Sequence, residues 1–309
     1  MHHKTLFHLL IAAILVLCML PVAVSAQDAG VDAETALEQA RALAAEQSPA
    51  ILPTTLAVPS GAVDPLFIGV DDSAVPAYTV NTATNAFTPH ALGVQVWGSA
   101  YDAVNDIVYI NNGSTLYAWP VGGAIATLGT ITDPAGATQA MTGLAFYNGT
   151  LYGVKNIANE AVYTIDTTTR VATVYIDYVD ADYDFGGLAA DPNTGTLYGT
   201  SDDTTPFGSG LFRINPDATA TQITPYPTGQ TDIDGLAVSH DGFAYLVTDE
   251  PGFIYVWDFG AAAYVTPLNN PWTSSEVFSA GAWISPASGG DPNIDVAPLS
   301  LSSTQPTNT

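Results

Sequence analysis

The chain has 309 residues, 30 of them acidic and 5 basic, so its formal net charge at neutral pH is −25. Proteins that bind nucleic acid or an anionic membrane surface need clusters of Lys and Arg, and this composition excludes both functions. Charged residues make up 11% of the chain, against roughly 25% in soluble domains, while apolar residues make up 47%. An ordinary hydrophobic core is therefore expected, under a surface built from Thr, Ser, Asn, Gly and Asp.

Residues 1–26 have the features of a secretory signal peptide. Lys4 provides a short positive region, residues 6–24 are almost entirely apolar, and Val24-Ser25-Ala26 supplies small residues at the cleavage site. Cleavage removes Cys18, the only cysteine, so the mature domain must be stabilised by its core and not by disulfide bonds. We expect a mature protein that is secreted or periplasmic and inserts no segment into a membrane. Its four remaining basic residues are Arg41, Lys155, Arg170 and Arg213.

Two segments of different composition flank the predicted domain at 54–284. Residues 27–53 are rich in Ala, Glu and Leu, and the apolar positions between 28 and 47 fall on one helical face, which predicts a short N-terminal helix. We interpret this helix as a spacer, with a partner-binding helix as the alternative. Residues 285–309 are rich in Ser, Pro, Thr and Asn, which is the composition of a disordered tail.

Within residues 54–284 one pattern recurs about every 45 residues. Each of the first four copies begins with a Gly that small or apolar residues follow, and a second strand with a central Tyr comes next; the fifth copy is weaker and has only the Gly-led strand. A third strand with an aromatic residue and a Thr-rich fourth strand complete the copy. Four short antiparallel strands at this period are typical of a β-propeller blade. The repeated glycines are Gly98, Gly143, Gly187, Gly235 and Gly281.

The copies predict an all-β propeller of five four-stranded blades. Strands near 66–70, 77–80 and 87–90 lack an inner strand, whereas 280–284 is an inner strand with no successors. Joining the two ends makes a fifth blade and closes the ring, which removes the open sheet edges. The alternative takes Leu56-Ala57-Val58 as the inner strand of that blade.

The phrase Asp234-Gly235-Leu236-Ala237-Val238-Ser239-His240-Asp241-Gly242 resembles the blades of secreted NHL and SMP-30/gluconolactonase-like propellers, whose pattern is GLA…G-x-LYG. The resemblance covers most of residues 65–284 and implies the propeller fold. For lactonases of that kind it also implies six blades and a calcium ion held by carboxylate and amide ligands at the channel mouth. This chain has one blade fewer in our count, and no motif in it matches those ligands.

In a propeller, the loops from second to third strand and the loops leading into the next blade share one rim. In this chain these loops predict an acidic face rich in amides. Trp272, in a Pro-rich loop ahead of the last inner strand, is the best candidate for an exposed binding aromatic. The predicted ligand-binding residues are Asp71, Asp72, Asp202, Asp203, Asp249, Glu250 and Trp272.

One loop on this rim has the spacing of a cation site. Asp180, Asp182 and Asp184 alternate with other residues and offer three carboxylates to a hard cation such as Ca²⁺, with Asp177 or Asp232 as a further donor. Calcium is the only cofactor that the sequence suggests. A solvated acidic loop is the alternative interpretation.

Catalytic motifs are scarce. Asp184 and Asp232 each lie three residues before a repeated glycine, so they are the pair of carboxylates that a hydrolase would use, with ordinary rim acids as the alternative. The sequence has no G-x-S-x-G, H-E-x-x-H or P-loop motif, and His90 and His240 are the only histidines of the mature chain.

The sequence therefore predicts a secreted, non-catalytic five-bladed propeller that binds a glycan or an extracellular protein through its acidic face. One alternative is a calcium-dependent hydrolase or lactonase that uses carboxylates of the same face. The other is a structural component of an extracellular layer or fibre.

Overall fold

The computed structural model describes residues 65–72, 76–157, 160–178, 183–203 and 207–284. The predicted signal peptide, the N-terminal helix and the C-terminal tail lie outside these ranges. All regular secondary structure within them is β-strand, and none of them contains a helix long and apolar enough to span a membrane.

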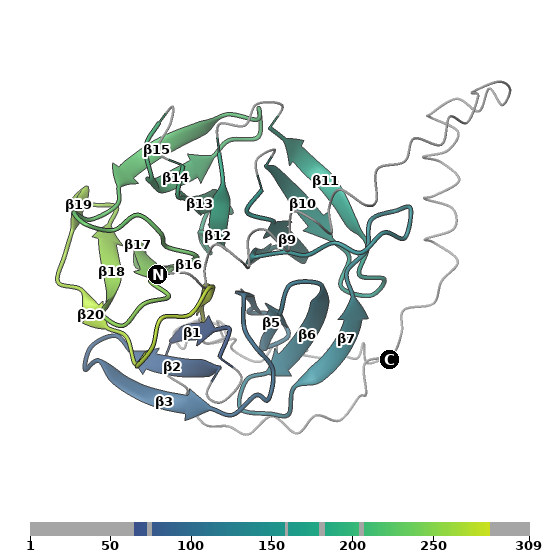
Figure 1. Ribbon diagram of the computed structural model, residues 1–309, viewed down its shortest axis with the longest axis horizontal. Coiled ribbons are helices and arrows are strands. Elements are labelled where there is room, and N and C mark those ends of the chain that lie inside the picture. The colour runs from purple at the N-terminus through teal and green to yellow at the C-terminus, as the bar shows by residue number, and fades with distance from the viewer. Residues whose placement is uncertain (1–64, 73–75, 158–159, 179–182, 204–206, 285–309) are drawn as a thin grey trace, which may run out of the picture. The chain divides into compact units, whose positions relative to one another are not determined.

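Five antiparallel sheets surround a central axis as the blades of a propeller (Figure 1). In blades 2 to 5 the chain runs outward from the axis, one strand after another, as the repeat predicts. Blade 2 contains β4 (Gly98–Asp102), β5 (Ile107–Asn111), β6 (Thr115–Pro120) and β7 (Ala126–Thr130). Blade 3 contains β8 (Gly143–Tyr147), β9 (Thr150–Val154), β10 (Ala161–Ile165) and β11 (Ala172–Asp177). Blade 4 contains β12 (Phe185–Ala190), β13 (Leu197–Ser201), β14 (Gly210–Ile214) and β15 (Ala220–Pro225). Blade 5 contains β16 (Gly235–Val238), β17 (Phe243–Val247) and β18 (Phe253–Asp258), and its outer strand is divided into β19 (Ala263–Tyr264) and β20 (Leu268–Asn269).

Blade 1 combines both ends of the domain and closes the ring. Its inner strand is β21 (Ser279–Trp283), which pairs with β1 (Leu66–Val70), and β2 (Ala77–Asn81) and β3 (Ala86–His90) follow outward. The register runs antiparallel from Leu66↔Trp283 to Val70↔Ser279. This confirms the predicted closure by two termini and gives the inner position to the C-terminal strand.

The hydrophobic core consists of layers between neighbouring blades. Every residue of β1 is buried, because both faces of the strand pack against side chains. Phe67 of blade 1 meets Trp119 of blade 2 with ring centroids 5.6 Å apart, in a cluster that also contains Val108 and Ile110. Burial on two faces explains why these strands are continuous apolar runs and do not alternate with polar residues.

The loops fall on two faces of the ring. Tight turns join the first strand to the second and the third to the fourth on one face, which we call the turn face. At Asn148 and Gly149 both residues have positive φ, 47° and 81°, which suits the two-residue hairpin between β8 and β9. The loops from second to third strand, and those leading into each next blade, lie on the other side, which we call the acidic face.

The repeated glycines are required because the inner strands approach each other closely at the axis. A Cβ atom on Gly187 would lie 2.2 Å from the carbonyl oxygen of Asp234 in the next blade. On Gly98 it would lie 2.5 Å from the carbonyl oxygen of Thr142, again one blade further. Real Cβ atoms do not approach backbone so closely, so any side chain there would push two blades apart.

We predict that Gly187→Ala lowers the free energy of unfolding by about 1–3 kcal/mol, because the added methyl group overpacks the axis. Urea unfolding of the mature protein measures this effect. Gly260→Ala is the matched control, since a Cβ there meets only the Asp258 carboxylate, at 3.3 Å. The control should change stability by less than about 0.5 kcal/mol. Equal effects of the two substitutions would contradict the axial explanation.

Candidate functional site

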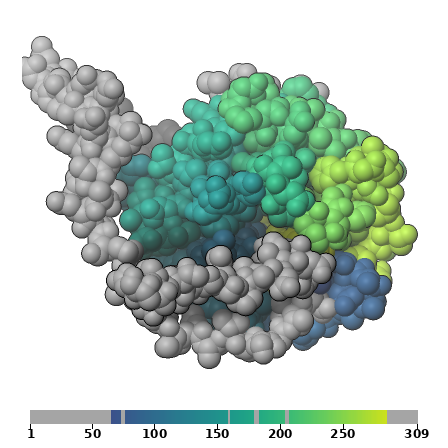
Figure 2. Space-filling model, turned by 180° about the vertical axis from the view of Figure 1, so that it is seen from behind, coloured from purple at the N-terminus to yellow at the C-terminus, as the bar shows by residue number. Residues whose placement is uncertain are grey.

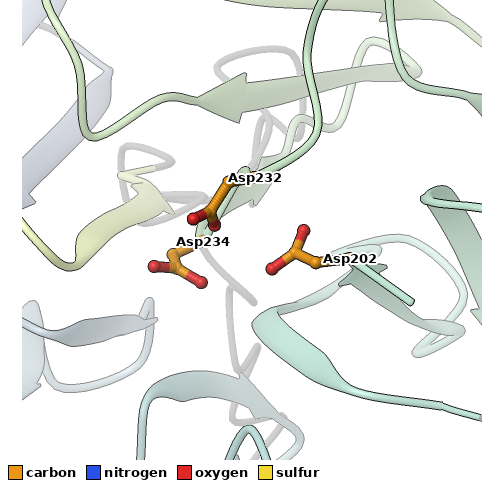
Figure 3. Close-up of side chains that lie close together, drawn as sticks. All are labelled: Asp202, Asp232 and Asp234. Carbon is orange, nitrogen blue, oxygen red and sulfur yellow. The ribbon is translucent and has the colours of Figure 1, made fainter. Parts of the chain in front are cut away.

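Three aspartates converge on the acidic face where the axis opens between blades 4 and 5. Asp202 follows β13, and Asp232 and Asp234 lie in the segment that leads into β16. One carboxylate oxygen from each lies within 4.8 Å of the other two, and Figure 3 shows the three side chains directed toward a common space. We call these residues the aspartate triad.

Asp234 reaches its position because blade 4 has two glycines at its inner edge. Its Oδ1 atom lies against Gly186, where a Cβ would be only 2.1 Å away. The Asp234 side chain is buried, with 4% of its surface exposed, and Oδ1 has no hydrogen-bond partner among the described residues. An ionised oxygen in this state is costly unless a ligand compensates for the lost hydration.

Asp202 is held in place by its neighbours. Its Oδ1 accepts a hydrogen bond from the Tyr226 hydroxyl at 2.8 Å and from the Ile233 amide at 3.3 Å. These bonds connect the end of β13 to the segment that carries the other two aspartates. The triad is therefore built from two blades through fixed contacts.

Two of the three aspartates, Asp234 and Asp202, have raised pKa values. Burial, followed by the charges of Asp202 and Asp232, raises the pKa of Asp234 well above its ordinary value. Burial and the Asp232 charge raise the pKa of Asp202 to about 8. Within the described part of the chain no basic side chain forms an ion pair with the triad, and the ion pair that is found joins His240 to Asp241 on the turn face. The described residues thus leave the charge of the triad uncompensated.

More acids surround the triad. Burial and the charges of Asp203 and Asp232 raise the pKa of Asp184, whose Oδ1 is buried without a hydrogen-bond partner in the described residues. Burial and the Glu250 charge, together with the Asp232 charge, raise the pKa of Asp249 to about 7. The structure thus places four of the predicted ligand-binding residues, Asp202, Asp203, Asp249 and Glu250, in one electrostatic neighbourhood. The suggested hydrolase pair, Asp184 and Asp232, belongs to the same neighbourhood.

Other predicted residues have different positions. Asp180 and Asp182 lie outside the described residues, so the structure places only Asp184 of that loop. Asp71 accepts hydrogen bonds at Oδ1 from the amides of Val277 (2.9 Å) and Phe278 (3.2 Å), and so links β1 to the loop before β21.

Asp72 and Asp177 also lie at blade ends on the acidic face. Asp72 follows β1 and is half-buried, and its charge contributes to the raised pKa of Tyr78. Asp177 ends β11 with an exposed side chain. Neither belongs to the aspartate triad.

Trp272 is not the exposed aromatic that the sequence suggested. Only 8% of its surface is exposed, its Nε1 donates to the carbonyl oxygen of Thr248 at 2.8 Å, and its ring packs edge-on against Tyr78. The Pro-rich loop folds this side chain between blades 5 and 1. Periodicity cannot reveal such packing, because the loop lies outside the repeated strands.

Sequence reasoning missed Glu160 and did not select Asp234 as a ligand. Glu160 is fully buried and accepts hydrogen bonds from the amides of Ala161 (2.8 Å) and Phe185 (3.2 Å), while burial raises its pKa to about 7. It joins blade 3 to the first residue of β12. Asp234 stands immediately before a repeated glycine, where the other copies have Trp97, Thr142, Gly186 and Ala280. An acidic residue at this position in only one copy is the feature of the sequence that could have identified Asp234 as a ligand.

A cavity of about 270 Å³ adjoins the acids between blades 4 and 5. Thr231 and Glu250, which line it, are the chain neighbours of Asp232 and Asp249. Its other wall holds Phe253, which is 43% exposed, and Tyr255, whose hydroxyl accepts a hydrogen bond from Gln230 Nε2 at 3.0 Å. We call this cavity the side pocket.

The axis ends on the turn face in a second cavity of about 280 Å³. Its walls are mainly apolar, with Ala145, Phe146 and Trp283 among them. Asp102, its acidic residue, accepts hydrogen bonds from the amides of Val104 and Asn105 in its own turn. The aspartate triad, with its unpartnered carboxylate oxygen, lies at the opposite end of the axis.

The aspartate triad fits a divalent cation with oxygen ligands. Oxygens no more than 4.8 Å apart are separated by about twice a Ca²⁺–oxygen distance, which is about 2.3–2.6 Å. Hard carboxylate donors suit Ca²⁺, and the buried Asp234 Oδ1, which has no hydrogen-bond partner among the described residues, is free to act as a ligand atom. A bound cation would also lower the pKa values that mutual repulsion raises.

Comparisons with known proteins leave the function open. No protein-family model matches the chain, and no curated protein matches it. A chain of a nidogen/laminin complex resembles it with a TM-score of 0.48 at 11% identity, covering 72% of this chain and 99% of that one. A gluconolactonase from Xanthomonas campestris resembles it with a TM-score of 0.41 at 15% identity, covering 71% and 91%. Likeness at this level carries no argument about binding or catalysis.

We predict that, without divalent cations, the protein is more stable at pH 5 than at pH 8.5. The pKa values of Asp202, Asp249 and Asp234 are raised in the fold, so the folded state holds more protons than the unfolded state above about pH 4. Stability should fall by at least about 2 kcal/mol between pH 5 and pH 8.5, which lowers the melting temperature by at least several degrees. Calorimetric melting in chelator measures this, and a melting temperature that rises over the same range would contradict the explanation.

Proposed function

We propose that this protein is a secreted, calcium-dependent, non-catalytic binding protein, and that its ligand is a glycan. The cation site is the aspartate triad, and the ligand lies over the acidic face beside it. One observation carries the proposal: the Asp234 carboxylate is buried at the axis, lacks a partner at Oδ1, and faces two further carboxylates.

Calcium at the triad would neutralise the charge that the chain leaves uncompensated. With one oxygen from each, the three aspartates supply fewer oxygens than the six to eight that Ca²⁺ accepts, so the ion has further positions for other oxygens. The charges of Asp184 and Asp249 contribute to the raised pKa of Asp234, so both side chains lie near the triad. Both would also attract a calcium ion bound there. Sugar hydroxyl groups can occupy remaining positions on such an ion.

The side pocket supports a glycan as the ligand. It combines two exposed or partly exposed rings, Phe253 and Tyr255, with hydrogen-bonding groups of Gln230, Thr231 and Glu250. An aromatic wall covers the apolar face of a sugar ring, while polar groups accept and donate hydrogen bonds to its hydroxyls. Two residues that line the side pocket are chain neighbours of acids at the cation site: Thr231 precedes Asp232, and Glu250 follows Asp249. One ligand can therefore contact both the pocket and the ion. Secretion, which the signal-like residues 1–26 support, would bring the protein to extracellular glycans.

We predict that calorimetric titration of the mature protein with CaCl₂ shows binding, and that Asp234→Asn weakens it by at least about tenfold, because a charged ligand is lost. In chelator the same variant should melt at a higher temperature than the wild type, since Asn, unlike Asp234, need neither be buried as a charge nor take up a proton on folding. Asp241→Asn is the matched control: its side chain is 61% exposed and lies on the turn face. Absence of calcium binding, or equal affinities of wild type and Asp234→Asn, would contradict the cation site.

We predict that a glycan array probed with the mature protein gives signals in calcium that disappear in chelator. Phe253→Ala should weaken binding to the strongest glycan by about tenfold, as expected when a stacking ring is removed, and leave calcium affinity unchanged. Phe207→Ala is the control, because this ring is 49% exposed on the same face and does not line the side pocket. Glycan binding that is insensitive to chelator or to Phe253→Ala would exclude this site.

A calcium-dependent hydrolase is the second candidate, and Asp249 is the observation in its favour. A carboxyl group whose pKa is raised to about 7 beside a cation site is suited to transfer protons. Turnover of lactones or glycosides by the mature protein in calcium, abolished by Asp249→Asn, would establish this function in place of binding alone.

A further inference from the structure

The repeat provides an internal comparison for each residue of a blade. A side chain that recurs at one position of several blades serves the common fold. A side chain that departs from its counterparts in a single blade needs another explanation. Two such departures, Tyr175 and Arg213, line the same groove on the turn face between blades 3 and 4, which lie side by side in both views (Figures 1 and 2).

Tyr175 occupies a bulge in the fourth strand of blade 3. In the pairing of β10 with β11, Val162 is opposite Ile176 and Tyr163 is opposite Val174, so Tyr175 is the extra residue. The same bulge in blades 2 and 4 holds Leu128 and Ile223, which are half-buried and pack against the core clusters of their blades.

Tyr175 instead exposes half of its surface. Its ring contacts that of Tyr152, with centroids 5.6 Å apart at 55°. A bulge redirects a side chain without disturbing the rest of the strand. Here it directs an aromatic ring to the groove.

Arg213 departs from its counterparts on the third strand. The equivalent residues of blades 2, 3 and 5 are Ala118, Thr164 and Val256, none of which is charged. The Arg213 Nε donates a hydrogen bond to Asn215 Oδ1 at 3.1 Å, and Asn215 donates in turn to Thr219 and Thr221. These bonds fix the plane of the guanidinium group at the groove.

The groove has a volume of about 320 Å³, and Arg213 is its only charged lining residue. The other walls present the two Tyr rings and the polar groups of Thr194, Thr196 and Asn215. In a chain with 30 acidic and 5 basic residues, this groove is lined by one positive charge and by no acid. Two acids lie beside it: Asp191 accepts a hydrogen bond from the Thr194 hydroxyl at 2.8 Å, and Asp217 accepts one from the Thr219 hydroxyl at 2.6 Å. The composition of the groove suits a ligand with a flat apolar face, several hydroxyls and one carboxylate.

We propose that this groove binds a carboxylated sugar, with the pyranose ring on Tyr175 and Tyr152 and the carboxylate on Arg213. A planar guanidinium binds a carboxylate through two parallel hydrogen bonds, which distinguishes it from a neutral hydroxymethyl group. The groove lies on the turn face, so the site is separate from the aspartate triad and does not depend on calcium.

The test is titration of the mature protein with D-glucuronate and with its neutral counterpart D-glucose, in chelator so that the cation site makes no contribution. The wild type should bind glucuronate about tenfold more tightly than glucose, as expected for a charge-assisted pair of hydrogen bonds. Arg213→Gln should remove that preference, and Arg213→Lys should restore only part of it. Tyr175→Ala should weaken binding of both sugars.

Val174→Ala is the matched control, because Val174 is exposed to the same degree on the same strand and does not line the groove. It should bind glucuronate like the wild type. Absence of glucuronate binding by the wild type overturns the proposal, and so does a preference for glucuronate that survives in Arg213→Gln. Because chelator is present throughout, these results are independent of whether the aspartate triad binds calcium.

Discussion

The close approach of five inner strands at the axis is the constraint on which this structure depends. Only glycine within the first three residues of each inner strand lets the backbone of one blade contact that of the next. The same geometry brings the residues just ahead of each glycine together around the axis. In blade 5 that residue is Asp234, and the paired glycines Gly186 and Gly187 of blade 4 make room for its carboxylate and its carbonyl oxygen.

The aspartate triad makes this arrangement costly for the chain alone. Asp234 is buried and Asp202 is half-buried, and burying a carboxylate without a basic partner favours its protonated form or the presence of a cation. Without a cation, burial and the charges of Asp202 and Asp232 favour the protonated form of Asp234, against the tendency of an ordinary aspartate to ionise. A divalent cation removes the conflict, since it converts mutual repulsion into shared attraction. The site therefore couples stability to the presence of a ligand.

Much of the fold follows from the sequence, because the period and the repeated glycines specify blades and their number. The choice of inner strand in blade 1 did not follow, since Leu56-Ala57-Val58 and residues 280–284 are both apolar, and only the pairing of β1 with β21 decides it. The acidic face was predictable from loop positions, and Asp202, Asp232 and Asp249 lie there. Burial of individual side chains was not predictable, so Glu160 was missed, Asp234 was not selected as a ligand, and Trp272 was expected at the surface. Departures from the repeat proved the most informative signal, at Asp234 on one face and at Tyr175 and Arg213 on the other.

The two proposed sites lie on different faces of the ring: acids gather around the axis on one face, and on the other Arg213 lies beside two tyrosine rings in a groove between blades 3 and 4. The central claim is that the acidic mouth holds a cation. It is tested most directly by an anomalous difference map from crystals of the mature protein grown with terbium, a substitute for calcium at carboxylate sites. The account predicts a peak about 2.3–2.6 Å from carboxylate oxygens of Asp202, Asp232 and Asp234. A map with no peak among these three residues, or with peaks only elsewhere, would contradict it.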